Sequence, residues 1–359
     1  MRNLILLMTL LISISGFAQK LKTENVILIT LDGMRWQDVY SGADSLLVDD
    51  SGYVEDPEGL TNQYWNEDPT VRREILMPFI WSTIVKNGQL YGNRTLGNKV
   101  NCSNQMWFSY PGYNEILTGA ADDERITSNS KLPNPNTTVL EFLNKQKAFK
   151  GKVYAFGSWD VFPYIINEER SGVPVNAGFE KEVGDISEKE KTLNELQDEM
   201  RSPWGSVRYD AFTHHYALEC LKNDKPRALF ISYGETDDYA HEGEYDQYLL
   251  SATQTDDYIK EIWEYVQSDT NYKDKTTLII TTDHGRGTMP KDTWRSHGTS
   301  IKGADQIWIA VIGPDTPASG EMYDDKQYYQ NQVARTITSL LGLKYDQSKA
   351  GETIAEAIR

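Results

Sequence analysis

Three apolar, β-rich segments of this chain each lead into an aspartate. They are residues 26–31 before Asp32, residues 228–233 shortly before Asp237, and residues 277–282 before Asp283. Segments with so little polar alternation are typical of strands that are buried on both faces, as in a parallel sheet covered by helices. The three aspartates therefore mark the carboxyl ends of strands in an expected α/β sheet.

Helix-patterned segments alternate with the strand-like ones along the chain. Residues 153–156 and 307–312 are two further expected strands, and the expected helices cover residues 139–147, 209–222, 245–267 and 328–341. This alternation predicts an α/β fold with a mostly parallel central sheet and helices on both faces. In such sheets, functional sites form beyond the carboxyl ends of the strands, which is where the aspartates lie.

Residues 19–359 are expected to form a single domain with two insertions. Residues 41–74 are acidic and rich in glycine, asparagine, tyrosine and tryptophan, and residues 165–203 are polar with a charged, helix-like stretch. Both follow or adjoin expected strand ends. We expect these insertions to cover the site, and ordinary surface loops are the alternative.

The first eighteen residues have the pattern of a secretory signal peptide. Arg2 provides the positive start, residues 4–14 an apolar core, and Gly16 and Ala18 the small residues before a cleavage site. A core of about 11 residues is too short to span a bilayer comfortably. We expect residues 1–18 to be removed and the mature protein to be secreted or periplasmic, without stable membrane insertion.

Composition narrows the set of binding partners. A net charge of −17 repels nucleic-acid polymers and anionic membrane surfaces. A small anionic substrate remains compatible with the sequence if a metal ion provides local positive charge. Cys102 and Cys220 are too few for a disulfide scaffold, and the sequence leaves open whether they form one bridge or stay buried thiols.

Three of the five histidines accompany the strand-end aspartates. They are His241, His284 and His297. Asp237 and His241 are four residues apart, so both can face one point from a helical turn. Three histidines and three aspartates suit zinc, but they exceed what one zinc ion takes from a protein. Two zinc ions about 4 Å apart fit the set better, as in phosphoryl-transfer sites.

Single motifs of this kind also have structural explanations. An aspartate after a strand is often a helix N-cap. His214 and His215 lie in a helix-patterned segment with no acidic or cysteine partner in register, and we expect them to be structural. The site prediction depends on the joint occurrence of the aspartates and histidines at strand ends.

A nucleophile is expected at Ser109. Pro111 suits the first turn of a helix, which places Ser109 at the helix amino end, where free N–H groups and the dipole favour an anion. A metal ion there would stabilise the serine alkoxide. The alternative is that Ser109 only caps the helix. The alkoxide and the three aspartates carry four negative charges, which two zinc ions would balance.

These residues together resemble the alkaline phosphatase superfamily, and within it the nucleotide pyrophosphatase/phosphodiesterase branch. The resemblance runs from about residue 26 to residue 314 and depends on five motifs. These are Leu31-Asp32-Gly33-Met34-Arg35, Ser109-Tyr110-Pro111 in place of the common Thr-Phe-Pro, Asp237-Asp238-Tyr239-Ala240-His241, Asp283-His284-Gly285, and His297.

The resemblance implies a division of the ligands between the two zinc ions. One ion would be held by Asp237, His241 and His297, and the other by Asp32, Asp283 and His284 beside Ser109. Hydrolysis would pass through a phosphoseryl intermediate. The phosphate-binding asparagine of the family lies beyond the nucleophile, and Asn129 is its nearest match in this sequence.

The chain also departs from the family pattern. Gly112 and Tyr113 replace the usual Asn-His after the proline, whereas serine in place of threonine should keep the chemistry. Sulfatases of the superfamily use a Cys/Ser-x-Pro-x-Arg motif and one calcium ion. This chain has Tyr113 at the position of the arginine, so sulfate ester hydrolysis is a minor alternative.

The expected substrate is a small phosphoric diester. Phosphomonoesterases of the superfamily place arginine or lysine on the extra phosphate oxygens, and residues 156–162 contain neither. Tyr110 and Trp159 could instead stack a base or an aryl leaving group, although core packing would equally explain such aromatics. The alternatives are a phosphomonoesterase that uses Arg125 or Lys131, and a non-catalytic binding protein.

Overall fold

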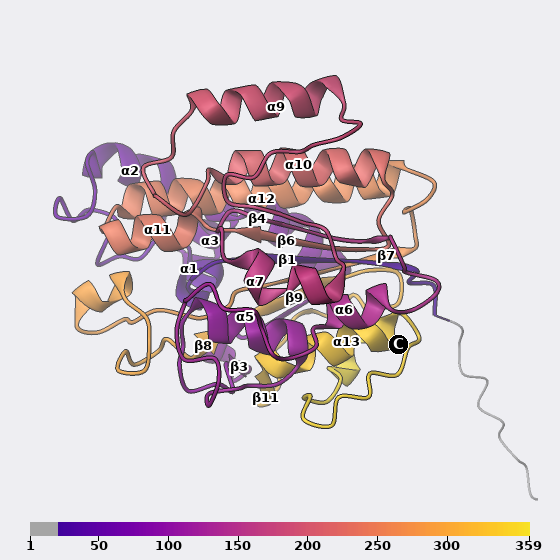
Figure 1. The fold of residues 1–359 in the computed structure, drawn as a ribbon. Coiled ribbons are helices and arrows are strands. Elements are labelled where there is room, and N and C mark those ends of the chain that lie inside the picture. The colour runs from indigo at the N-terminus through magenta and orange to yellow at the C-terminus, as the bar shows by residue number, and fades with distance from the viewer. Residues whose placement is uncertain (1–20) are drawn as a thin grey trace, which may run out of the picture.

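The computed structural model describes residues 21–359 and has an eight-stranded sheet with the order β10-β2-β9-β7-β1-β6-β4-β5 (Figure 1). The strands are β1 (Asn25–Leu31), β2 (Gln89–Tyr91), β4 (Val153–Gly157), β5 (Val175–Ala177), β6 (Ala228–Tyr233), β7 (Thr276–Thr281), β9 (Ile309–Ile312) and β10 (Gly320–Glu321). β1 lies between β6 and β7 and is parallel to both, while β9 is antiparallel to β7 and β2. The predicted fold class is confirmed.

β1 shows why the apolar segments form the centre of the sheet. All seven of its residues are buried. Ile27, Ile29 and Leu31 point into one hydrophobic core, and Val26 and Leu28 point into the other. A strand alternates its side chains between two faces, so a continuous apolar segment is stable only when helices cover both.

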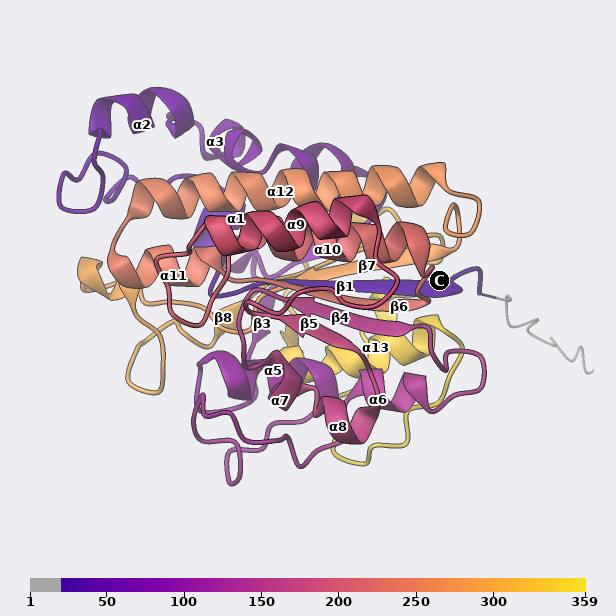
Figure 2. The same ribbon diagram turned by 45° about the horizontal axis from the view of Figure 1, so that its top comes forward.

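Helices cover the two faces of the sheet as separate layers (Figures 1 and 2). One layer contains α1 (Trp36–Ser41), α2 (Pro57–Tyr64), α3 (Pro69–Leu76), α9 (Glu188–Glu199), α10 (Asp210–Asn223), α11 (Glu235–Glu242) and α12 (Tyr245–Ser268). The other contains α5 (Ser109–Thr118), α6 (Val139–Asn144), α7 (Phe162–Ile165) and α13 (Val333–Leu340). Buried Cys102 and Cys220 lie in opposite cores, so they are separate free thiols.

Two predicted elements differ from the structure. The expected strand 307–312 is divided into β8 (Gln306–Ile307) and β9 by Trp308, whose buried indole N–H donates to the carbonyl of Met34. β8 joins β3 (Lys99–Asn101) and β11 (Gln327–Tyr329) in a second, three-stranded sheet. The first residues of the expected helix 328–341 form β11, because Tyr328 pairs with β3.

A helix from each of the two insertions packs on the helical layer. α3 packs against α1 and α12, and α9 packs against α10, where Leu193 enters the core. Figure 1 shows α9 on the outer side of α10. The apolar residues of these two helices are buried against the neighbouring helices. The expectation that the insertions cover the site stays a prediction.

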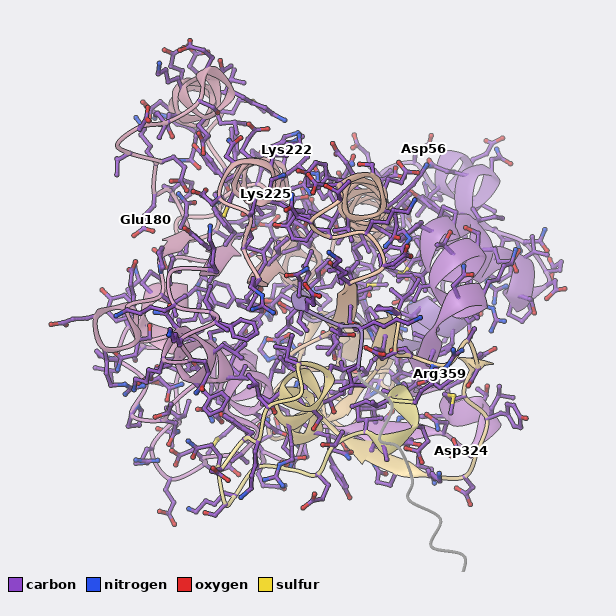
Figure 3. All side chains as sticks on the ribbon, turned by 90° about the vertical axis from the view of Figure 1, so that its right-hand side faces the viewer. Asp56, Glu180, Lys222, Lys225, Asp324 and Arg359 are labelled. Atoms are coloured by element: carbon purple, nitrogen blue, oxygen red, sulfur yellow. The ribbon has the colours of Figure 1, made fainter. Side chains whose placement is uncertain are left out.

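The predicted signal peptide lies outside the described residues. Among residues 21–359, no helix combines the length and apolar character needed to cross a membrane. Charged side chains project from separate parts of the surface, with Asp56, Glu180 and Asp324 well apart in Figure 3. Several elements therefore contribute to the net charge of −17.

Asp256 of α12 is a buried carboxylate with a predicted effect on the pH dependence of stability. It accepts hydrogen bonds from the backbone N–H groups of Phe79 and Ile80, at 2.6 and 2.9 Å. Burial raises its pKa to about 7. Asp256 therefore keeps its proton up to about pH 7 in the folded state. In the unfolded state it releases the proton above an ordinary pKa of about 4. Ionisation of Asp256 should lower stability as pH rises from about 4 to about 7.

The Asp256→Asn variant should lack this dependence. Relative to the variant, the wild type is expected to lose about 4 kcal/mol of unfolding free energy across this range, at about 1.4 kcal/mol per pH unit. Urea unfolding of both proteins at several pH values between 4 and 8 measures the difference. Parallel pH profiles would show that Asp256 does not titrate in this range.

Candidate metal centre

The carboxyl ends of three adjacent strands bring six predicted side chains together. Asp32 directly follows β1, Asp237 and His241 lie on α11 after β6, and Asp283 and His284 follow β7. His297 follows the 3-10 helix Lys291–Arg295. Because β1 lies between β6 and β7, side chains far apart in the sequence converge at one edge of the sheet.

Asp32, Asp283 and His284 form the more deeply buried group. His284 Nε2 lies 3.4 Å from Asp32 Oδ1 and 3.4 Å from Asp283 Oδ2. These three atoms are buried and have no hydrogen-bond partner in the part of the chain that the structure describes. Bonds of about 2.0–2.1 Å at tetrahedral angles separate two zinc ligands by about 3.3 Å. The three atoms therefore fit one divalent cation.

The remaining residues form a second group around Asp237. His241 Nε2 lies 3.3 Å from Asp237 Oδ2 and 2.9 Å from His297 Nε2, and His297 Nε2 lies 3.8 Å from Asp237 Oδ1. His284 Nε2 is also 3.8 Å from Asp237 Oδ1, so the two groups share a boundary. His241 is on the solvent side, with 46% of its side chain exposed. Asp237, His284 and His297 make up a second candidate metal-binding group, which shares His284 with the first.

The carboxylates of the cluster have opposite pKa shifts. Burial and the charge of Asp237 raise the pKa of Asp32 well above the usual range, and burial and the charge of Asp32 do the same for Asp283. Burial also acts to raise the pKa of Asp237, but Arg286, His241 and His297 outweigh it, and the pKa lies well below the usual value. Buried carboxylates that disfavour their own ionisation are stabilised by a bound cation.

Arg286 is a member of the site that the sequence analysis missed. Its fully buried guanidinium contacts Asp237 Oδ1 and donates to the carbonyl of Gly33 at 3.1 Å and to that of Arg295 at 2.8 Å. Gly33 has a φ of +60°, and a Cβ there would lie 2.7 Å from Asp237 Oδ1. Arg286 directly follows Asp283-His284-Gly285, a position that could have indicated its role.

Ser109 is the first residue of α5 and does not cap it. Phe108 occupies the N-cap position without a side-chain capping bond, so the capping explanation for Ser109 is wrong. Trp107 has a φ of 51°, which turns the chain into the helix, and Asn104 Oδ1 accepts from its N–H at 2.9 Å. Ser109 itself is 5% exposed.

α5 places Ser109 toward the aspartates. Residues three and four positions after Ser109 share its side of the helix. Gly112 lies against the backbone of Asp283, and the hydroxyl of Tyr113 donates to Asp32 Oδ2 at 2.9 Å. The hydroxyl of Ser109 therefore belongs to the helix face that contacts the cluster.

The three predicted substrate-binding residues have different environments. Asn129 is exposed, and its Oδ1 accepts from the backbone N–H of Tyr110 at 3.0 Å, which places it beside Ser109. Trp159 is half-buried and makes an edge contact with Phe162. Tyr110 is 2% exposed and donates to the carbonyl of Leu132. Tyr110 therefore does not offer the stacking face that the sequence suggested, because its ring fills the core.

His214 and His215 form a separate group with Glu261. His214 Nδ1 lies 3.0 Å from the hydroxyl of Tyr233, and its Nε2 lies 2.9 Å from a carboxylate oxygen of Glu261. The sequence analysis found no acidic partner because Glu261 comes from α12, on a different segment. Both ring nitrogens of His214 are engaged, as in a structural histidine.

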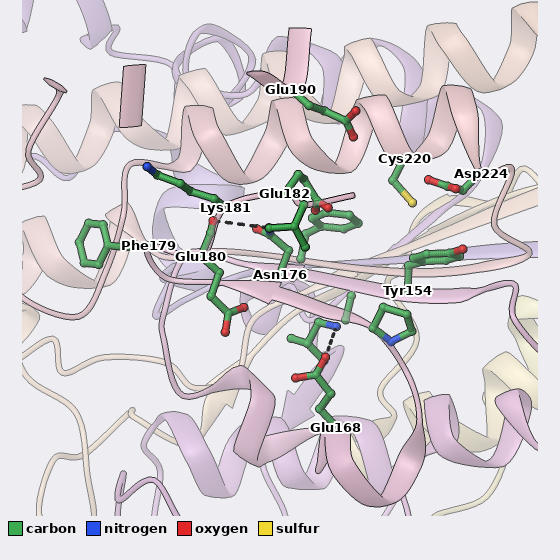
Figure 4. A pocket seen from close by; sticks show the side chains of 15 residues that line it. Tyr154, Glu168, Asn176, Phe179, Glu180, Lys181, Glu182, Glu190, Cys220 and Asp224 are labelled. Atoms are coloured by element: carbon green, nitrogen blue, oxygen red, sulfur yellow. Dashed lines mark hydrogen bonds between the residues drawn. The ribbon is translucent and has the colours of Figure 1, made fainter. Parts of the chain in front are cut away.

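A large cavity in the described part of the chain lies away from the metal cluster. It has a volume of about 600 Å³ and lies beside β4 and β5, with Tyr154, Asn176, Glu182 and Cys220 among its lining residues (Figure 4). None of the six cluster residues lines it. Cavity size alone would therefore have selected a different place from the one that the side-chain chemistry indicates.

Comparison with known proteins places the fold in a known family. A model of the Sulfatase family matches residues 24–343, whereas a search of curated proteins returned no match. Among solved structures, the chain is similar to the alkaline phosphatase PafA, with a TM-score of 0.60 and 10% identity over 95% of this chain and 99% of that one.

Two further solved structures have the same fold. One is the lipoteichoic acid synthase LtaP from Listeria monocytogenes, with a TM-score of 0.59 and 11% identity over 93% of this chain and 76% of that one. The other is the phosphonate monoester hydrolase SpPMH from Silicibacter pomeroyi, with a TM-score of 0.56 and 13% identity over 92% and 76%. None of these likenesses selects the nucleotide pyrophosphatase/phosphodiesterase branch. The family match over residues 24–343 shows that the chain belongs to the Sulfatase family.

Proposed function

We propose that this protein is a secreted hydrolase of small phosphoric diesters that uses two zinc ions and the nucleophile Ser109. The main support is the convergence of three orphaned, buried ligand atoms from Asp32, Asp283 and His284. Asp237, His241 and His297 would hold the second ion. Zinc, when bound, would lower the pKa of a coordinated hydroxyl and stabilise charge on the leaving oxygen.

The side chains of the protein have distinct roles in this reaction. The oxygen of Ser109 forms a bond to phosphorus, and the bond to the leaving alcohol breaks, so that a phosphoseryl intermediate and a free alcohol result. Water then attacks phosphorus, the bond to Ser109 breaks, and a phosphoric monoester leaves. Asn129, beside the amino end of α5, would donate its amide N–H to a phosphate oxygen, and Trp159 would contact the organic group.

The charge of the site favours a substrate with one negative charge. The three aspartates and the serine alkoxide together carry four negative charges, which two zinc ions balance. Arg286 adds one positive charge inside the cluster. A phosphoric diester, with its single charge, neutralises this excess, whereas a monoester dianion leaves one negative charge without a counter-charge in a poorly solvated site.

The cations considered for a phosphomonoesterase are already paired. Lys131 lies 2.7 Å from a carboxylate oxygen of Asp160, and Arg125 lies 2.5 Å from one of Asp122. Both basic side chains are about half exposed. Their positive charges are therefore largely compensated, which supports the diester over the monoester.

The named activities of the solved structures with this fold cover different ester substrates. They include an alkaline phosphatase and a phosphonate monoester hydrolase. The family match keeps sulfate ester hydrolysis as a second candidate. Tyr113 at the arginine position of the sulfatase motif, and three histidines in the cluster, favour phosphorus over sulfur.

A substrate comparison tests the proposal. For bis-p-nitrophenyl phosphate, kcat/KM is expected to exceed that for p-nitrophenyl phosphate by about 100-fold, since one uncompensated charge at about 4 Å costs several kcal/mol. p-Nitrophenyl sulfate carries a single charge like the diester, and it is expected to react more slowly because Tyr113 stands at the arginine position of the sulfatase motif. Zinc content is measured on the same preparation by elemental analysis. Lys131→Ala should leave the diester-to-monoester ratio unchanged.

The other outcomes each contradict part of the proposal. Faster monoester cleavage that Lys131→Ala abolishes would identify a phosphomonoesterase. Faster sulfate ester cleavage would move the protein to the sulfatases. A protein that binds no metal and hydrolyses none of the three esters would overturn both the metal site and the hydrolase assignment.

A further inference from the structure

A chain of four buried side chains connects the nucleophile helix to a predicted metal ligand. The hydroxyl of Thr30 donates to Ser232, that of Ser232 donates to Tyr113, and that of Tyr113 donates to Asp32 Oδ2, each at 2.9 Å. All four side chains are at most 5% exposed. The chain links β1, β6 and α5 and ends at the carboxylate that follows β1.

The carboxylate determines the direction of these hydrogen bonds. Asp32 is ionised when it binds a metal ion, and an ionised aspartate only accepts, so in that state Tyr113 must donate its single proton to Asp32. The oxygen of Tyr113 is then free to accept from Ser232, and Ser232 accepts from Thr30 in turn. The hydroxyls of Ser232 and Tyr113 each donate and accept, so the buried chain is rigid, since any reversal would leave an unpaired group in the core.

The bond from Tyr113 selects which oxygen of Asp32 is left open. Oδ2 is occupied by the phenol, while Oδ1 has no partner among the described residues and faces His284 Nε2. Asp283 has the same division: its Oδ1 accepts from the backbone N–H of Gly33 at 3.0 Å, and its Oδ2 is open. Each carboxylate is thus held by one oxygen and presents the other toward the same point.

Gly112 makes the reach of Tyr113 possible. A Cβ at residue 112 would collide with the backbone oxygen of Asp283 and lie 2.9 Å from its carbonyl carbon. The missing side chain lets α5 pack directly on the strand end that carries Asp283. At this separation the phenol of the next residue reaches Asp32. Gly112 and Tyr113, which replace the Asn-His expected for the phosphodiesterase branch, therefore act as one unit.

We infer that Tyr113 is a positioning residue that orients Asp32 for the metal ion and couples the nucleophile helix to that ion, an inference that depends on the proposed two-metal function. Groups that hold a metal ligand from behind typically change metal affinity or activity by about 10–100-fold when they are removed. The loss of the phenol should therefore weaken metal binding at the Asp32, Asp283 and His284 group.

Tyr113→Phe tests this inference because it removes one oxygen and keeps the ring. The matched control is Tyr345→Phe, which removes another buried tyrosine hydroxyl, bonded to the carbonyl of Thr118 at the opposite end of α5. Zinc affinity of the metal-free proteins is measured by competition with a chromogenic chelator. Kinetics with bis-p-nitrophenyl phosphate at saturating zinc and thermal unfolding of the metal-free proteins accompany it.

Tyr113→Phe is expected to weaken binding of one zinc ion by about 10–100-fold and to lower kcat, with a smaller change in KM. Tyr345→Phe should leave zinc affinity unchanged, even where both variants lower metal-free stability to a similar extent. Ser232→Ala, which leaves the bond to Asp32 in place, should give an intermediate loss of affinity.

Equal zinc affinity for wild type and Tyr113→Phe, with two ions bound and diester hydrolysis intact in the wild type, overturns the positioning role alone. A wild type that binds no zinc and hydrolyses no ester overturns the proposed function itself. Equal losses of zinc affinity in Tyr113→Phe and Tyr345→Phe would show a general packing effect and likewise reject the inference.

Discussion

Ser109→Ala is expected to lower kcat for bis-p-nitrophenyl phosphate by about 10⁴-fold or more, while the zinc content stays at that of the wild type. The side chain lies on the face of α5 that contacts Asp283 and Asp32, and its hydroxyl supplies the attacking oxygen. Removing a covalent nucleophile eliminates the two-step path and leaves only residual hydrolysis from the rest of the site. Steady-state kinetics with zinc analysis on the same samples measure both quantities.

Ser109→Thr is the matched variant, because it keeps the hydroxyl and has the residue that is common in the phosphodiesterase branch. It should retain a substantial part of the activity. Acid quenching during turnover should trap a phosphoryl group on the peptide that contains Ser109 in the wild type, and no such peptide should form from Ser109→Ala. Near-wild-type turnover by Ser109→Ala would show that another group attacks phosphorus.

Asp283→Asn is expected to change stability in opposite directions with and without metal. The amide can still accept from the N–H of Gly33, but the negative charge of the atom 3.4 Å from His284 Nε2 is lost. In the metal-free protein, the substitution removes a fully buried carboxylate whose pKa burial and Asp32 raise. The metal-free variant should therefore be more stable than the metal-free wild type, by about 1–3 kcal/mol.

The metal-loaded variant should be the less stable one. Loss of one site forfeits about 4 kcal/mol of stabilisation when free zinc exceeds its dissociation constant 1,000-fold. Elemental analysis should find one zinc ion fewer per chain, and diester turnover should fall by about 10³-fold or more. Unfolding of the wild type and of the variant, each with zinc and with chelator, measures whether the order of their stabilities reverses.

His215→Ala is the control for Asp283→Asn. His215 belongs to the group with Glu261, which lies outside the predicted centre. This variant should keep the zinc content and turnover of the wild type. If Asp283→Asn retained every bound ion and full turnover, Asp283 would not be a ligand.

Local features of the sequence were sufficient to predict the central strands of the sheet and the residues that follow them. The strands that carry the site are continuous apolar segments, and the burial of every residue of β1 agrees with that pattern. Parallel strands place their carboxyl ends at one edge, so the aspartates that follow them converge without further information. His241 and His284 follow these aspartates within four residues, which is why most of the cluster could be predicted from the sequence.

Contacts between distant segments were not visible in the sequence. Arg286 pairs with Asp237, Glu261 with His214, and Tyr113 with Asp32, and each of these pairs joins different elements. The two insertions looked like site covers, but their helices pack on α10 and α12. Secondary-structure propensity and residue spacing reflect a residue and its neighbours in the sequence. They do not indicate which distant segment packs against that residue.

The sequence by itself determined which residues follow the strands of this protein. Apolar strand segments lead into aspartates and histidines that suit metal ions. Only the tertiary structure decided how each carboxylate is oriented, because that depends on where a second element places a donor. Gly112 illustrates the difference, since its missing side chain matters only where α5 meets the backbone of Asp283. Burial and direction of the ligand atoms are properties of the packed fold, and they are what make the cluster a candidate metal centre.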